Sequence, residues 1–182
     1  MAQMRALLLL LLLSLFGGAR AEVVDRVMYV VEDQLVLQSD VQLNAAINPL
    51  DASPSPFWSR PGADPEQQMV DAAILRHLAG NVALYQPSDD EVRTRTEAIR
   101  ARFLDRASWQ VFLEGWGLDE RSFRSVIRRR MVVERYLARN LRADPADPEE
   151  WWAATTAVLE EVRVRVRIRR VELRGETATG EE

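Results

Sequence analysis

The 182-residue sequence predicts a mainly helical α+β fold with a small antiparallel β-sheet. Two short valine-rich strands follow residue 22, a segment of alternating valines lies near the end, and amphipathic helical patterns fill most of the sequence between them. A lone hairpin is marginal in water, so we expect the late strand to pair with it. The two ends of the chain would then meet in one sheet packed on a helical bundle.

The first 21 residues have the three parts of a cleavable secretory signal. Arg5 supplies a positive charge, residues 6–16 are almost wholly apolar, and Ala19 and Ala21 are the small residues that a signal peptidase recognises. An uncleaved anchor is the alternative, but the apolar run is shorter than the roughly 20 residues that span a bilayer. We expect cleavage after Ala21, a periplasmic location and no stable membrane insertion afterwards.

The composition excludes several kinds of site and partner for the exported chain. It contains no cysteine, which excludes disulfides, thiolate metal sites and a cysteine nucleophile. All 24 basic residues are arginine, and two of them leave with the signal, so 22 remain beside 28 acidic residues and the net charge is −6. We expect no nucleic-acid partner, because neutralisation of phosphates supplies most of that affinity.

The N-terminal strands are expected to form a hairpin over Val23–Gln38, with the polar residues 32–34 as its turn. Ser39 or Asp40 would then cap a short helix that starts at Val41, since either side-chain oxygen can accept a hydrogen bond from a free backbone N–H group.

A proline-rich loop is expected over residues 48–65, because proline removes backbone donors and resists helix formation. Phe57 and Trp58 lie inside this loop, where aromatic residues either pin the loop to the core or face a partner. We expect these two to be exposed. A helix then opens with Asp64 as its cap and a proline at its first position, and its apolar stripe extends to Tyr85.

Three more helices are predicted before a junction in the chain. A capping box that begins at Ser88 starts a mostly polar helix to about Leu104. Ser108 starts a short helix that a glycine ends, and Asp119 caps the last long helix.

The junction is Asp144–Pro148, and a capped helix with Trp151 and Trp152 follows it. From residue 162 onward valine and isoleucine alternate with arginine, which predicts a strand with one apolar and one cationic face. The cationic face either protects the sheet edge from pairing with other chains or contacts acidic clients or a partner. Its arginines are Arg163, Arg165, Arg167 and Arg169.

Three segments follow one another in an order and spacing known from one family. They are the strand and helix start over residues 23–41, the helix junction Pro87–Val92 and the arginine-rich helix over residues 123–133. Together they resemble the N-terminal domain of SurA-type periplasmic chaperones, and residues 151–173 resemble the C-terminal helix and strand of that family. The parvulin isomerase domains of SurA would stand at the Asp144–Pro148 junction and are absent.

The resemblance implies both a domain organisation and a function. A SurA N-terminal-like chaperone domain would cover residues 22–143, residues 144–174 would complete the same domain, and residues 175–182 would be a disordered tail after removal of the signal peptide at 1–21. The implied function is a periplasmic holdase that binds unfolded or partly folded polypeptides, outer-membrane proteins among them, without isomerase activity. A homodimer is compatible with this organisation.

No catalytic, cofactor-binding or metal-binding residues are expected. The only histidine, His77, lies in mid-helix and is expected to be partly buried, and no catalytic triad, phosphate loop or metal-ligand spacing is present. A holdase needs exposed aromatic and flexible apolar side chains, because these bind many sequences through contact area. The candidate polypeptide-binding residues are Phe57, Trp58, Met69, Trp109, Phe112 and Trp116.

Two alternatives stay open at this point. Trp109 and Phe112 have helical spacing, so they can equally belong to the core. For the whole protein, the alternative is a structural subunit that docks one folded envelope partner. A degenerate isomerase would require prolyl isomerase activity, which we do not expect from this sequence.

Overall fold

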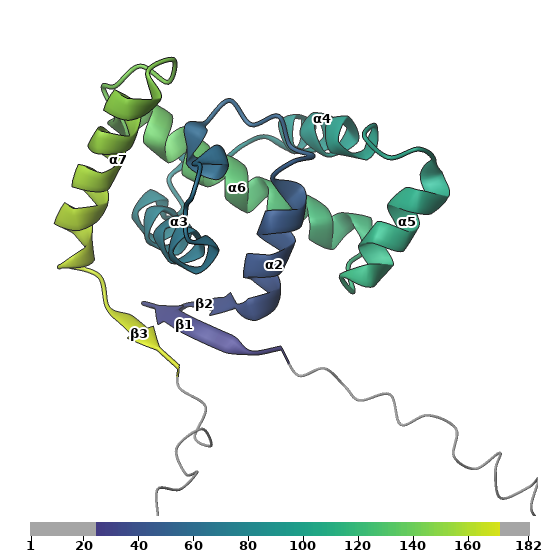
Figure 1. Ribbon diagram of the computed structural model, residues 1–182, viewed down its shortest axis with the longest axis horizontal. Coiled ribbons are helices and arrows are strands. Elements are labelled where there is room, and N and C mark those ends of the chain that lie inside the picture. Colours follow the sequence, from purple (N-terminus) through teal and green to yellow (C-terminus); the bar gives the residue numbers. More distant parts are fainter. Residues whose placement is uncertain (1–24, 172–182) are drawn as a thin grey trace, which may run out of the picture.

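The computed structural model describes residues 25–171, so the predicted signal peptide and polar tail lie outside the described residues. Within this range the fold is mainly helical with a three-stranded antiparallel sheet, as the sequence predicts (Figure 1). The strands are β1 (Val27–Val31), β2 (Gln34–Leu37) and β3 (Ile168–Arg170). The α-helices are α2 (Gln38–Ile47), α3 (Pro65–Ala79), α4 (Asp89–Arg100), α5 (Arg106–Gly115), α6 (Glu120–Asn140) and α7 (Pro148–Arg163), and the 3-10 helices are η1 (Pro56–Ser59) and η2 (Ala83–Tyr85).

The sheet joins the two ends of the described chain, which confirms the predicted pairing. Its strand order is β2-β1-β3, and β1 pairs antiparallel with both neighbours. Glu32 in the hairpin turn has a φ of 53°, and this left-handed conformation forms a tight turn without glycine. Val31 and Val36 are buried against the helices, so the sheet is anchored on the bundle that lies over it in Figure 1.

The C-terminal strand is much shorter than predicted. The expected strand from residue 162 is wrong for most of its length, because α7 continues to Arg163 and only three residues pair with β1. Leu159 and Val162 are three residues apart on α7, so the helical period places both against the core, and Val166 packs against the same core from the turn after the helix. Val164 is 84% exposed, so the alternating valines do not form one buried face.

The predicted four-arginine face is not formed either, because Arg163 and Arg165 lie outside β3 and pair with separate partners. Arg163 at the end of α7 pairs with Asp71 on α3, which ties these two helices together. Arg165 pairs with Glu161 one helical turn earlier, at 2.9 Å and in an exposed position.

Most helix starts follow the predicted caps, but two do not. The side chains of the predicted caps of α3, α4, α6 and α7 accept backbone hydrogen bonds, as expected. α2 begins three residues earlier than predicted, because neither Ser39 nor Asp40 caps it; Asp40 lies in the first turn and accepts from the Leu37 N–H (3.2 Å). In α5 the cap is Asp105, and Ser108 completes its capping box.

Two helices end before the predicted residue. α3 stops where Gly80 adopts a φ of 50°, so Tyr85 belongs to η2 and not to the stripe of α3. α4 ends at Arg100, after which tighter backbone hydrogen bonds close the last turn. The chain then leads Leu104 into solvent at 96% exposure.

Helix α6 runs through two apolar cores. Its second half packs with the sheet, α3 and α7, and contributes Val133 and Leu137. Its first half packs with α2, α4 and α5, and contributes Phe123 and Ile127. The arrangement makes α6 the axis of the bundle, with α7 and the sheet toward one end and α5 toward the other (Figure 1).

A buried network of charges joins the loop after α2 to α4 and α6. The Asp51 carboxylate accepts hydrogen bonds from Arg95 (2.7 and 2.8 Å) and from Arg130 (3.2 Å). Arg95 also donates to Glu134 (2.8 Å). Two arginines therefore balance two carboxylates in positions shielded from water.

The two arginines of the network respond differently to burial. Burial opposes the charge of Arg95, but hydrogen bonds to Asp51 and Glu134 outweigh it and raise the pKa of Arg95 above its usual value. Burial lowers the pKa of Arg130 to about 10 despite the attraction of the same carboxylates. Arg130 also lies over the ring of Trp58, 4.1 Å from its centre, which adds a cation–π contact.

Replacing Asp51 by asparagine tests the network. The variant leaves Arg130 without its carboxylate partner in a buried position, so we expect a loss of about 3–5 kcal/mol in the free energy of unfolding. Urea unfolding followed by circular dichroism measures it. In the control, Glu161→Gln removes the exposed pair with Arg165 and should cost less than about 1 kcal/mol. Equal stability of the two variants would contradict the network's role.

Candidate functional site

The structure separates the six predicted polypeptide-binding residues into two groups at opposite ends of the bundle. Phe57, Trp58 and Met69 belong to the core beside the sheet, and all three are buried. Trp109, Phe112 and Trp116 belong to the core around α5, where Trp109 is buried and the other two are half-buried. The six residues do not form one surface.

The expected exposure of Phe57 and Trp58 is wrong. Within the proline-rich loop, the Ser55 side chain accepts the N–H of Phe57 (3.3 Å) and starts η1, which turns both aromatic rings inward. The Phe57 ring packs edge-on against Trp58 and stacks on Trp152 of α7, at centroid distances of 4.7 and 6.1 Å. The carbonyl of Phe57 accepts a hydrogen bond from Gln68 (2.7 Å). The loop is therefore pinned to the core.

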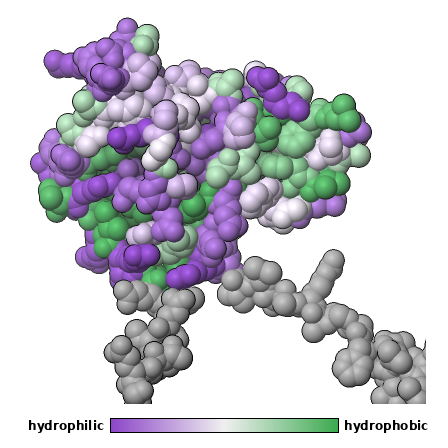
Figure 2. Space-filling view, viewed as in Figure 1, coloured by the Kyte–Doolittle hydropathy of each residue, from purple (hydrophilic) through white to green (hydrophobic). Residues whose placement is uncertain are grey.

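Around α5 an aromatic cluster supports an exposed apolar surface. The rings of Phe103, Phe112 and Phe123 surround Trp109 at centroid distances of 5.2, 5.8 and 4.9 Å. Outside this cluster, Leu104 is 96% and Val111 is 68% exposed. We define Leu104, Val111, Phe112 and Trp116 as the arm surface, and Figure 2 shows hydrophobic residues gathered at this end of the molecule.

Sequence reasoning missed the two most exposed members of the arm surface. Val111 does not share the helix face of the buried residues Trp109 and Leu113. An apolar residue on the polar face of a helix could have predicted its exposure from the sequence. Leu104 was expected inside a helix, so nothing in the pattern marked it as exposed.

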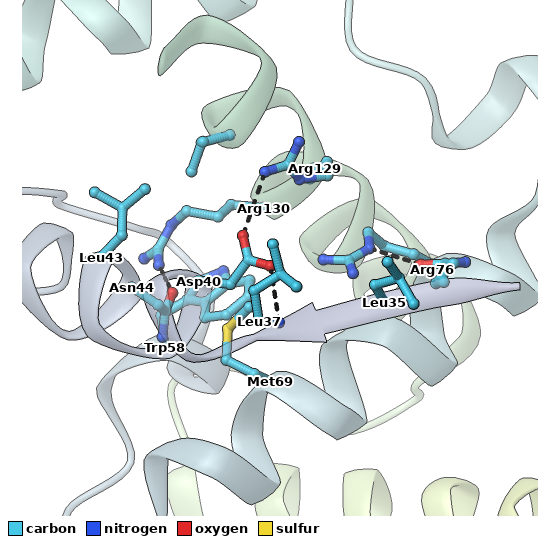
Figure 3. A pocket seen from close by; sticks show the side chains of 12 residues that line it. Leu35, Leu37, Asp40, Leu43, Asn44, Trp58, Met69, Arg76, Arg129 and Arg130 are labelled. Carbon is cyan, nitrogen blue, oxygen red and sulfur yellow. Dashed lines mark hydrogen bonds and ion pairs between the residues drawn. The ribbon is translucent and has the colours of Figure 1, made fainter. Parts of the chain in front are cut away.

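A cavity of about 370 Å³ opens between β2, α2, α3 and α6, and we name it the arginine pocket (Figure 3). Its volume is at the small end of the roughly 300–1,000 Å³ found for ligand sites. Its apolar wall consists of Leu35, Leu37, Leu43, Trp58, Met69 and Val126. Two of the predicted site residues, Trp58 and Met69, thus line a cavity although neither is exposed.

The charged wall of the pocket contains one aspartate and three arginines. Arg130 belongs to the buried network, and Arg129 lies 3.8 Å from Asp40. Arg76 donates its Nε–H to the neutral amide oxygen of Gln34 (3.1 Å), and among residues 25–171 it has no carboxylate partner. Asp51, which is not part of the pocket lining, neutralises Arg130. The charges of Arg76, Arg129 and Asp40 then sum to one positive charge.

Burial disfavours the positive charge of one arginine in this charged wall. Desolvation, together with the nearby positive charge of Arg129, lowers the pKa of Arg76 to about 10. Arg76 is therefore still protonated at neutral pH. Burial destabilises its positive charge, and an anion in the pocket would offset this free-energy cost. A guanidinium group with free donors is suited to a carboxylate.

A second cavity of about 300 Å³ lies where the proline-rich loop meets α6 and the start of α7. Arg95 and Glu134 of the buried network reach its wall. Its apolar lining consists of Pro54, Pro56, Met131, Ala138, Pro145 and Trp151. It is large enough to take an apolar side chain.

The structure offers no metal centre in the described part of the chain. Residues 25–171 hold no group of three or more acidic, histidine or cysteine side chains placed to bind a metal ion. His77 is exposed on α3, so its expected partial burial is wrong. None of the described helices combines the length and apolar character needed to cross a membrane.

Alanine substitutions distinguish core from surface around α5. Trp109→Ala removes the ring at the centre of the aromatic cluster, and we expect it to lower the free energy of unfolding by about 3–5 kcal/mol. Val111→Ala, two residues away and on the exposed side, should stay within about 0.5 kcal/mol of the parent protein. Urea unfolding of both variants measures the difference. A tolerated Trp109→Ala would place this tryptophan outside the core.

No family description matches the chain, and a search of curated proteins finds no significant relative. The resemblance to SurA-type chaperones therefore stays a prediction from the sequence.

Proposed function

We propose that the protein is a periplasmic holdase-type chaperone that binds unfolded or partly folded polypeptides, outer-membrane proteins among them, without isomerase activity. The arm surface is the observation that carries this proposal. Single exposed apolar residues are ordinary on soluble proteins, but the arm surface places two exposed ones, Leu104 and Val111, and two half-buried aromatic residues around one short helix (Figure 2). Apolar contact is non-directional, so such a surface binds many different sequences.

The support beneath the arm surface suits this role. Phe112 and Trp116 are half-buried and pack against the core around α5, and the Phe112 ring stacks on Trp109 at a centroid distance of 5.8 Å. Aromatic rings held in this way add contact area at little cost in side-chain entropy. A client would therefore meet a firm apolar platform.

Suppression of aggregation tests the proposal. An unfolded outer-membrane β-barrel protein is diluted into buffer with the purified protein, and light scattering is followed as the ratio of the two is varied. We expect suppression near equimolar ratio. The double variant Leu104→Ser, Val111→Ser should need roughly tenfold more protein, the change that about 1.4 kcal/mol of lost binding produces.

The matched control removes two exposed apolar side chains elsewhere. Val82 and Leu84, around η2, are 52% and 51% exposed, and the variant Val82→Ser, Leu84→Ser should suppress scattering as well as the parent protein does. Absence of suppression by the folded parent protein would contradict the holdase. It would favour a subunit that docks one folded envelope partner, which a pull-down from envelope extract would identify.

A further inference from the structure

The arginine pocket has an unbalanced charge that the fold does not explain. Arg76 forms no ion pair among the described residues, and the only hydrogen bond of its side chain there goes to Gln34 (3.1 Å). Arg129 is close enough to repel Arg76, and Arg129 itself forms an ion pair with Asp40 at 3.8 Å. Two cations share one carboxylate here, so the site keeps one unbalanced positive charge.

The apolar wall determines what kind of anion fits. Leu35, Leu43 and Met69 face the same cavity as the arginines, so the ligand needs an apolar group beside its negative charge (Figure 3). Within a polypeptide, aspartate and glutamate carboxylates end their side chains and carry no further apolar group. Only the last residue joins a carboxylate and an apolar side chain at one carbon atom.

The position of β2 accommodates such a chain end. β2 is an edge strand of the described sheet, and Gln34, Leu35 and Leu37 from this strand line the pocket. Edge strands are where extended peptides add in known modes of recognition, with side chains entering adjacent pockets. A chain that approaches along β2 would reach the arginines with its terminus.

We propose that the arginine pocket binds the C-terminal carboxylate of a polypeptide whose last residue is apolar. Arg76 and Arg129 hold the carboxylate, and the apolar wall receives the last side chain. This inference rests on the proposed holdase function, because it assigns to a second site the capture of free chain ends of the same clients.

A labelled peptide tests the inference on the unaltered protein. A ten-residue peptide that ends in phenylalanine carries fluorescein at its N-terminus, and fluorescence anisotropy gives its affinity as the free acid and as the C-terminal amide. We expect the acid to bind at least about tenfold more tightly, because charge-assisted hydrogen bonds to arginine are among the strong ones. Equal affinities for acid and amide would overturn the inference without any need for a variant.

Charge-matched variants locate the site. Arg76→Gln and Arg129→Gln should each reduce the affinity for the acid toward that for the amide. Arg124→Gln is the control, since Arg124 is an exposed arginine on α6 outside the pocket and its loss changes the net charge equally. Loss of the acid preference in the control, or its retention in both pocket variants, would contradict the assignment.

A competing fatty acid separates the two sources of an apolar carboxylate. Dodecanoate should displace the peptide acid only weakly, and stronger binding of dodecanoate than of the acid would overturn the assignment to chain ends. The scattering assay keeps the two proposals distinct. Suppression of aggregation without an acid preference refutes the pocket assignment alone, whereas an acid preference without suppression refutes the holdase alone.

Discussion

The neutralisation of four buried charges is the constraint on which the rest of the structure depends. Asp51, Arg95, Arg130 and Glu134 can leave water only together, because each of them alone would be an uncompensated charge. Asp51 therefore fixes the start of the proline-rich loop against α4 and α6. Once that loop is fixed, η1 can turn its aromatic residues into the core, and Trp58 can become a wall of the arginine pocket.

Helix α6 connects this constraint to both proposed binding surfaces. Its first half buries Phe123 against the aromatic cluster that carries the arm surface. Its middle supplies Arg129 to the pocket and Arg130 to the network, so adjacent residues line the proposed binding site and stabilise the fold. One rigid helix thus holds the apolar platform and the cationic pocket at a fixed separation, which suits a protein that contacts an extended client at two points.

The parts of the fold that follow from local chemistry could be predicted from the sequence, and the long-range parts could not. Caps such as Asp119 act on residues two or three positions away, so their pattern is visible in a single chain. Asp51 and Arg130 are 79 residues apart, and composition does not show which of 24 arginines is buried. The one available signal for the network was the position of Arg130 on the apolar stripe of its helix.

The difference between local and long-range contacts also explains why the expected exposure of Phe57 and Trp58 was wrong. The loop around Phe57 appeared exposed because its prolines exclude helix, but the contact with Trp152 that buries it comes from a distant helix.

The most direct test of the proposed function is hydrogen–deuterium exchange of the protein with and without an equimolar unfolded outer-membrane protein. If the arm surface binds the client, exchange in residues 103–118 becomes slower when the client is present. Unchanged exchange there, with protection confined to α7, would contradict it.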